Sequence, residues 1–210
     1  MFSLTTIIIG ITVLISIIGF GQPSFYEKAM FRPFNILHNK EYWRWVSGGF
    51  VHADYFHLAV NMFVLYSFGQ FLESYFIAYF QDLGKVILVV FYLLAIPVSS
   101  MYSYYKHKND FGYAAIGASG AVAAMLFASI LVQPFAELRL YFAIPIPAWL
   151  FGILYLVYEY YMGKKQQDNI GHDAHFYGAI YGLVFSIIIR SQIAVEFYNQ
   201  VLAKIAMLAA

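Results

Sequence analysis

Cysteine is absent from this chain of 210 residues. That absence excludes a disulfide framework, a thiolate nucleophile and a cysteine-ligated zinc site. Charge is also scarce, because only 11% of the residues are charged and the formal net charge is +1. A soluble domain carries about 25% charged residues, so the composition excludes an ordinary water-soluble globule. The near-zero net charge gives no electrostatic basis for binding nucleic acid.

Apolar and aromatic residues fill the rest of the chain, at 62% and 20% of the sequence. This abundance excludes a disordered chain, a collagen and a coiled coil, and it indicates an integral, multi-pass protein of the lipid bilayer. At about 20 apolar residues per span, the length holds six helices and no separate soluble domain. We therefore predict an all-α membrane protein, with residues 1–210 forming one six-span domain.

The gaps between charges place the six spans and one long loop. The predicted spans cover residues 4–20, 58–80, 86–105, 116–132, 140–162 and 174–190. Residues 21 to 56 form the long first loop, and a helical tail follows the last span to residue 210. The sixth apolar run is short, so we expect its helix to continue past Arg190, with that side chain snorkelling to the surface.

Polar residues at the starts of three spans require an explanation, because a bilayer makes them costly. His57 and Asn61 begin the second span, Ser119 lies between Gly117 and Gly120 at the start of the fourth, and His175 begins the sixth. Because spans alternate in direction, the second, fourth and sixth start on the same side of the membrane. We expect these side chains to lie at one shallow depth.

A hydroxyl, an imidazole and hydrogen-bond donors at one level are the components of a serine hydrolase. Ser119 is the predicted nucleophile and His175 the general base. His57, Asn61 and the backbone N–H of Ser119 are the predicted oxyanion donors, supported by Gly117. No carboxylate lies one helical turn from His175 on its own helix, and Asp173 points elsewhere, so we predict a dyad.

Small residues at these positions also permit close helix packing, which alone is the commoner reason for a short glycine motif. Gly178 and Gly182 form a GxxxG pair that allows the sixth span to approach the fourth. Packing and catalysis therefore predict the same arrangement, and the coincidence of three polar sites at one level favours the enzyme.

At these residues the sequence resembles the rhomboid intramembrane serine proteases. The resemblance covers nearly the whole chain, through Glu41-x-Trp43-Arg44, His52-x4-His57-x3-Asn61, Gly117-x-Ser119-Gly120 and Ala174-His175-x2-Gly178-x3-Gly182. It implies a Ser119–His175 dyad, an oxyanion hole at His57 and Asn61, and structural roles for Trp43, Arg44 and His52 in a partly membrane-embedded first loop. It further implies a minimal bacterial form without cofactor or metal, whose partners are transmembrane protein substrates.

Two features depart from this family pattern. Many members have an aromatic residue four positions after the nucleophile, where this chain has Ala123, so Tyr177 or Phe176 would have to hold the ring of His175. The family pattern also implies a bacterial inner membrane with cytoplasmic termini and an active site toward the outer side. Eight Lys and Arg in the loops after the first, third and fifth spans, against four on the other side, oppose that orientation.

Three other classes compete with the protease. His172 and His175 are three apart, and with His52, His57 and Asp173 they suggest a His-ligated metal enzyme, although no HExxH motif is present. A non-catalytic rhomboid-fold protein that binds or escorts membrane clients would usually lack the serine or the histidine. A transporter would be expected to show inverted repeats.

Within the protease interpretation, the fifth span and the loop that follows it are candidates for a lateral gate and cap. The span carries a row of bulky residues at Trp149, Phe151, Tyr155 and Tyr158, and the loop covers residues 163 to 173.

Overall fold

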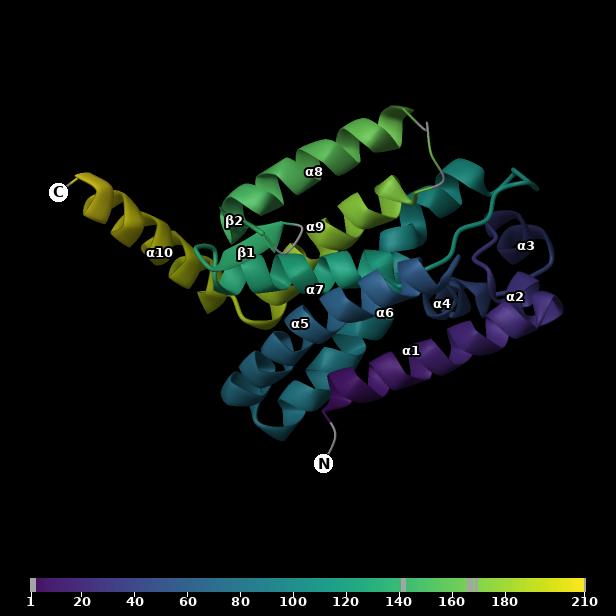
Figure 1. Ribbon diagram of the computed structural model, residues 1–210, viewed down its shortest axis with the longest axis horizontal. Helices are drawn as coiled ribbons and strands as arrows, with labels where there is room; N and C mark the ends of the chain where they lie inside the picture. Colours follow the sequence, from purple (N-terminus) through teal and green to yellow (C-terminus); the bar gives the residue numbers. More distant parts are fainter. Residues whose placement is uncertain (1–2, 141–142, 166–167, 169, 210) are drawn as a thin grey trace.

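The computed structural model describes residues 3–140, 143–165, 168 and 170–209 (Figure 1). Its elements are α1 (Leu4–Gly21), α2 (Pro23–Ala29), α3 (Pro33–His38), α4 (Arg44–Ser47), a 3-10 turn (Gly48–Phe50), α5 (Tyr55–Phe80), α6 (Asp82–His107), α7 (Ser119–Val132), β1 (Glu137–Leu140), β2 (Ile144–Pro147), α8 (Ala148–Lys165), α9 (His172–Ile189) and α10 (Gln192–Ala209). The described chain is thus mostly helical, as predicted.

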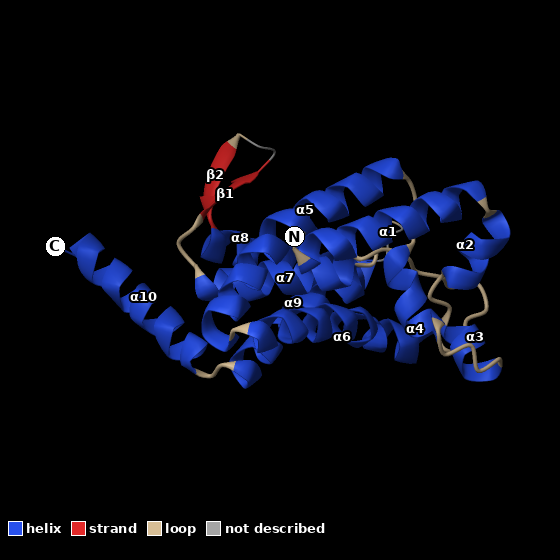
Figure 2. Ribbon diagram, turned by 90° about the horizontal axis from the view of Figure 1, so that it is seen from below, coloured by secondary structure: helices blue, strands red, loops and turns tan. Residues whose placement is uncertain are grey.

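Helix α7 is the centre of the bundle, with α5, α6, α8 and α9 around it (Figures 1 and 2). Every residue from Gly120 to Leu131 is buried. The closest approach is to α9, where a Cβ on Gly178 would lie 2.1 Å from the carbonyl oxygen of Gly120 and one on Gly182 would lie 2.2 Å from that of Ala124. The backbones of α7 and α9 therefore touch, which only glycine permits at these two positions.

The buried side chain of Arg44 stabilises the first loop through hydrogen bonds. One terminal nitrogen of its guanidinium donates to the carbonyl oxygens of Glu27 and Met30, both at 2.8 Å, and its Nε donates to the Glu41 carboxylate. These carbonyls belong to the last turn and the C-cap of α2, so Arg44 joins the end of α2 to α4. Trp43, by contrast, is 56% exposed.

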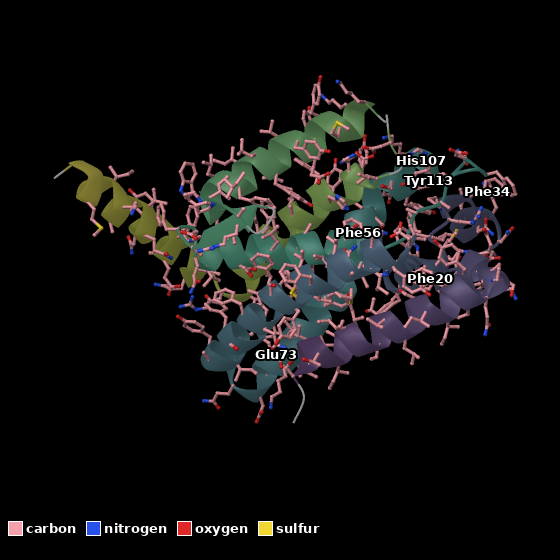
Figure 3. All side chains as sticks on the ribbon, in the orientation of Figure 1. Phe20, Phe34, Phe56, Glu73, His107 and Tyr113 are labelled. Atoms are coloured by element: carbon pink, nitrogen blue, oxygen red, sulfur yellow. The ribbon has the colours of Figure 1, made fainter. Side chains whose placement is uncertain are left out.

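A buried glutamate on α5 caps the first helix. The Glu73 carboxylate accepts from the backbone N–H groups of Leu4 (2.8 Å) and Thr5 (2.9 Å) and from the hydroxyl of Thr5 (2.8 Å). Figure 3 shows Glu73 beside the first turn of α1. Free N–H groups and the positive end of the helix dipole favour an anion there, which accounts for a charge in this apolar segment.

Two helices, α1 and α6, are long and apolar enough to cross a membrane, or three if the bent pair α9 and α10 is taken as one span. Helix α7 is apolar but has only 14 residues, and the 18 residues of α8 include Glu159, Lys164 and Lys165. The described helices thus support an integral membrane protein, whereas the six-span count remains a prediction.

The expectation of a helix from residue 140 is wrong at its start. The strands β1 and β2 pair antiparallel, with Glu137 opposite Pro147 and Leu140 opposite Ile144, and α8 begins only at Ala148. Figure 2 shows this hairpin standing out from the helices. A proline inside a helix removes a hydrogen bond and clashes with the preceding turn, and Pro145 and Pro147 lie in this stretch. The fold is therefore not purely α.

The sixth helix does not continue through Arg190, so that expectation is also wrong. Helix α9 ends at Ile189, and α10 leaves it at an angle of 109°. The Arg190 guanidinium donates to both carboxylate oxygens of Glu196 (2.7 and 2.5 Å) and to the hydroxyl of Tyr75 (2.7 Å). Its charge is therefore held by protein partners, and the predicted tail is the separate helix α10.

Candidate active site

The starts of α5, α7 and α9 lie toward the same end of the bundle (Figure 1). Ser119 is the first residue of α7, and His175 lies in the first turn of α9. The hydroxyl oxygen of Ser119 lies 2.7 Å from Nε2 of His175, a hydrogen-bond distance. The structure thus brings together the two residues that the sequence paired.

A left-handed turn at Gly117 sets the position of the serine. Gly117 has φ of +109°, which side-chain-bearing residues rarely adopt, and its N–H donates to the carbonyl of Gly48 at 2.9 Å. A Cβ on Gly117 would also lie 2.7 Å from Cε1 of His57. The turn therefore needs glycine both for its positive φ and for the close approach of the His57 ring. It places Ser119 at the N-terminus of α7.

His52 braces this turn from the first loop. Its Nε2 accepts from the N–H of Ala118 at 3.3 Å, so the proton of the neutral ring is on Nδ1, which donates to the hydroxyl of Ser16 at 2.9 Å. That hydroxyl donates in turn to the carbonyl of Phe50. Burial, and secondarily the charge of a protonated His57, lowers the pKa of His52 to about 4. His52 is therefore a neutral structural contact to the residue before the serine.

The predicted oxyanion donors His57 and Asn61 come from α5 and line the same cavity as Ser119. Nδ1 of His57 accepts from the N–H of Ala53 at 3.4 Å, so the ring N–H of a neutral His57 is on Nε2, the atom that packs near Gly117. Asn61 is buried, and one amide N–H donates to the carbonyl of His57 at 2.9 Å. Because a primary amide has two N–H groups, the second stays available to an oxyanion.

A cavity of about 950 Å³ opens over these residues. Its walls come from α5, the end of α6, α7, α8, α9 and the segment between α6 and α7. They include His57, Asn61, His107, Tyr113, Ser119, Val122, Phe151, Tyr155, Gly171, His172 and His175. Figure 3 places His107 and Tyr113 at this end of the molecule. The volume is at the upper end of the range for ligand sites, so the serine faces a space large enough for a peptide segment.

A carboxylate that the sequence analysis missed lies behind His175. Nδ1 of His175 is 3.1 Å from one carboxylate oxygen of Glu159 on α8, and Nδ1 of His172 is 2.5 Å from the other. Nε2 of His172 lies 3.0 Å from Asp168. Glu159 comes from the neighbouring helix, so residue spacing on the helix of His175 does not reveal it. An ionisable residue inside a predicted span was the available signal.

The aromatic residues expected to hold the His175 ring have other partners. Tyr177 stacks on Tyr102 with ring centroids 5.0 Å apart, and Phe176 faces Tyr160 at 5.9 Å. The His175 ring lies edge-on to that of His172, with centroids 6.2 Å apart, and its hydrogen-bond contacts are to Glu159 and Ser119. Hydrogen bonds therefore orient this ring where an aromatic contact was expected.

The larger metal cluster suggested by the sequence is not assembled. Asp173 accepts from Lys106 at 2.9 Å, and His52 lies in the brace described above. Among the described residues, Glu159, His172 and His175 have one potential ligand atom each, all within 4.8 Å of one another. Their donor types, two imidazoles and a carboxylate, are ones that zinc accepts.

Comparison with known proteins identifies the family of this chain. The family model of the rhomboid domain matches residues 39–192, which is most of the chain, so the protein belongs to the rhomboid family. Two similar proteins come from Arabidopsis thaliana. RHOMBOID-like protein 12, mitochondrial, is 32% identical over 149 residues, which is 64% of this chain and 42% of that protein. Rhomboid-like protein 11, chloroplastic, is 26% identical over 176 residues, or 76% and 57%.

The chain spans about half the length of these curated relatives. Their names place them in organelles, so they lend no support to the expected bacterial membrane. Family membership and the apolar helices together identify an integral membrane protein of the rhomboid class.

Proposed function

We propose that this chain is an intramembrane serine endopeptidase with Ser119 as nucleophile and His175 as general base. The observation that carries the proposal is the 2.7 Å contact between the serine hydroxyl and Nε2 of His175, at the wall of a large cavity. Membership of the rhomboid family supports the same activity. Both residues are retained, which favours an enzyme over a non-catalytic rhomboid-fold protein.

The chemistry follows from this contact. The Ser119 oxygen bonds to the carbonyl carbon of the scissile peptide while its proton passes to Nε2 of His175. The C–N bond then breaks, and the histidine returns the proton to the leaving amine. Water, deprotonated by the same nitrogen, hydrolyses the acyl-enzyme and restores the serine. The oxyanion formed in each half would accept from the Ser119 backbone N–H, Nε2–H of His57 and the free amide N–H of Asn61.

The substrates we propose are membrane proteins with a single transmembrane helix, which enter from the bilayer into the six-span bundle. A peptide bond inside a helix is shielded by its own hydrogen bonds, so the segment must unwind before the serine can reach it. Good substrates should therefore carry small or helix-breaking residues near one end of the span. Replacing those residues with leucine should slow cleavage, and an unchanged rate would contradict this requirement.

The test of the activity is cleavage of a model transmembrane substrate by the purified protein in detergent, with a fluorophosphonate probe to label the nucleophile. Ser119→Ala and His175→Ala should each abolish cleavage, and the double variant should be no worse, because the two residues act as one unit. Label should be found on Ser119. Cleavage by Ser119→Ala at the wild-type rate would refute the proposal.

A metal-dependent hydrolase is the second candidate, because Glu159, His172 and His175 have ligand atoms within 4.8 Å of one another. The two candidates give opposite results with a strong chelator. Cleavage that survives chelation and is blocked by the fluorophosphonate supports the serine mechanism. Cleavage lost on chelation and restored by zinc supports the metal.

For the orientation, we propose the family arrangement, with cytoplasmic termini and the site opening to the outer side of a bacterial inner membrane. Because the chain has no cysteine, single cysteines can be introduced without background. A cysteine at exposed Lys40 should react with an impermeant maleimide added to intact cells. Labelling only after the membrane is opened would reverse the orientation.

A further inference from the structure

Glu159 is the one ionisable residue among the three buried positions of α8, the others being Ala148 and Gly152. Ile153 and Val157 on the same helix are 54% and 63% exposed, whereas Glu159 is 4% exposed. The glutamate is therefore turned inward, away from the lipid. A buried carboxylate is unfavourable unless it is paired, so the partners of Glu159 must donate hydrogen bonds to it.

The hydrogen bonds fix where the protons lie. His172 has a carboxylate at each ring nitrogen, Glu159 at Nδ1 and Asp168 at Nε2. With both carboxylates ionised, both nitrogens carry protons and the ring is an imidazolium. The other oxygen of Glu159 faces Nδ1 of His175. An ionised carboxylate only accepts, so His175 carries its proton on Nδ1, and its Nε2 has a free lone pair toward Ser119. That is the tautomer a general base requires.

We propose that Glu159 is a positioning residue that makes the dyad a Ser119–His175–Glu159 triad, with His172 as the counter-charge that holds Glu159 in place. This inference rests on the proposed protease function. During attack, the serine proton moves to Nε2 of His175, and the new imidazolium donates its Nδ1–H to the Glu159 carboxylate. Glu159 itself takes no proton and forms no bond to the substrate.

Glu159→Gln tests this arrangement because an amide has one accepting oxygen and the site has two N–H donors. The doubly protonated His172 takes that oxygen, so the amide N–H₂ faces Nδ1 of His175 and moves the ring proton to Nε2. Nε2 of His175 then carries a proton and cannot accept one from Ser119. We expect kcat to fall by about 10² to 10⁴-fold with little change in KM, as loss of the tautomer does in other triads. Glu159→Asp keeps a carboxylate and should recover at least tenfold over the glutamine variant.

Glu73→Gln is the matched control, since Glu73 is the other buried glutamate among the described residues and contacts α1 rather than His175. It should lower thermal stability and leave kcat within a few-fold of wild type in the folded protein. Nitrogen-15 spectra of labelled histidine, with His175→Gln to assign the signal, should show the His175 proton on Nδ1 in wild type and on Nε2 in Glu159→Gln. A structural role alone would not move that signal.

The results separate the two proposals. If Ser119→Ala is inactive while Glu159→Gln keeps wild-type kcat, the triad is refuted and the protease remains. If the two glutamine variants lose activity equally and in step with stability, Glu159 is a structural residue only, and the triad is again refuted. If Ser119→Ala still cleaves, the protease proposal itself fails, whatever Glu159 does.

Discussion

The neutral state of His52 makes the stability of the folded protein depend on pH in a calculable way. The pKa of the buried ring is lowered from 6.5 to about 4, mainly by burial. In the unfolded chain the ring takes up a proton near pH 6.5. Between these two values the unfolded state binds more protons, so the free energy of unfolding decreases as the pH falls. The protonated ring would also present an N–H to the N–H of Ala118, which now donates to it.

The size of this effect follows from the two pKa values. One pKa unit corresponds to about 1.4 kcal/mol, so the full loss is about 3 kcal/mol, and about 2.5 kcal/mol of it should appear between pH 7.5 and pH 4.5. The measurement is equilibrium unfolding in mixed micelles at the two pH values. Other groups titrate in the same range, so the informative quantity is the difference between wild type and a variant without the ring.

His52→Gln supplies that comparison, because its amide oxygen can still accept from Ala118 but does not titrate. The variant should lose about 2.5 kcal/mol less than wild type on acidification. His38→Asn removes an exposed histidine from the same loop and should retain the wild-type acid dependence. Parallel pH curves for wild type and His52→Gln would refute the assignment of a neutral, buried ring.

Four further substitutions test other contacts. Asn61→Ala and His57→Ala each remove one proposed oxyanion donor and should lower kcat by about 10²-fold or less, with probe labelling still detectable. If Asn61→Ala keeps its fold but is as inactive as Ser119→Ala, the assignment of Asn61 is contradicted. Gly178→Ala places a methyl group against the α7 backbone and should cost about 1 to 3 kcal/mol in unfolding experiments, and an unchanged stability would contradict the close contact. Arg44→Gln leaves carbonyls of α2 without their donor and should lower the melting temperature in a thermal scan, whereas full stability would show that the loop holds without it.

Much of the arrangement follows from simple patterns in the sequence. Apolar runs located the long helices, and the alternation of their directions placed Ser119 and His175 at one level, where they touch. Glycine spacing indicated the contact between α7 and α9 that Gly178 permits. These inferences succeed because they depend on composition and chain direction, which the sequence states directly.

The features that were not predicted from the sequence depend on contacts between residues far apart in the chain. Nothing local to His175 reveals that Glu159, on another helix, lies 3.1 Å away. At the break after Ile189, Glu196 and Tyr75 accept hydrogen bonds from the Arg190 guanidinium. The hairpin arises in an apolar stretch where hydropathy cannot separate strand from helix, and only Pro145 and Pro147 gave a local hint.

Because Glu159 lies on α8, the entry of a substrate and the orientation of the His175 imidazole are linked. Helix α8 is the element expected to move aside when a substrate segment enters from the lipid, and its carboxylate is bonded to the imidazole of His175. A hydrogen bond is lost beyond about 3.5 Å, so even a small outward displacement of α8 at Glu159 would disconnect it. Under the proposed protease function, opening of α8 would therefore also remove the contact that sets the tautomer of His175. Cleavage would then be fast only after the helix has closed around its substrate.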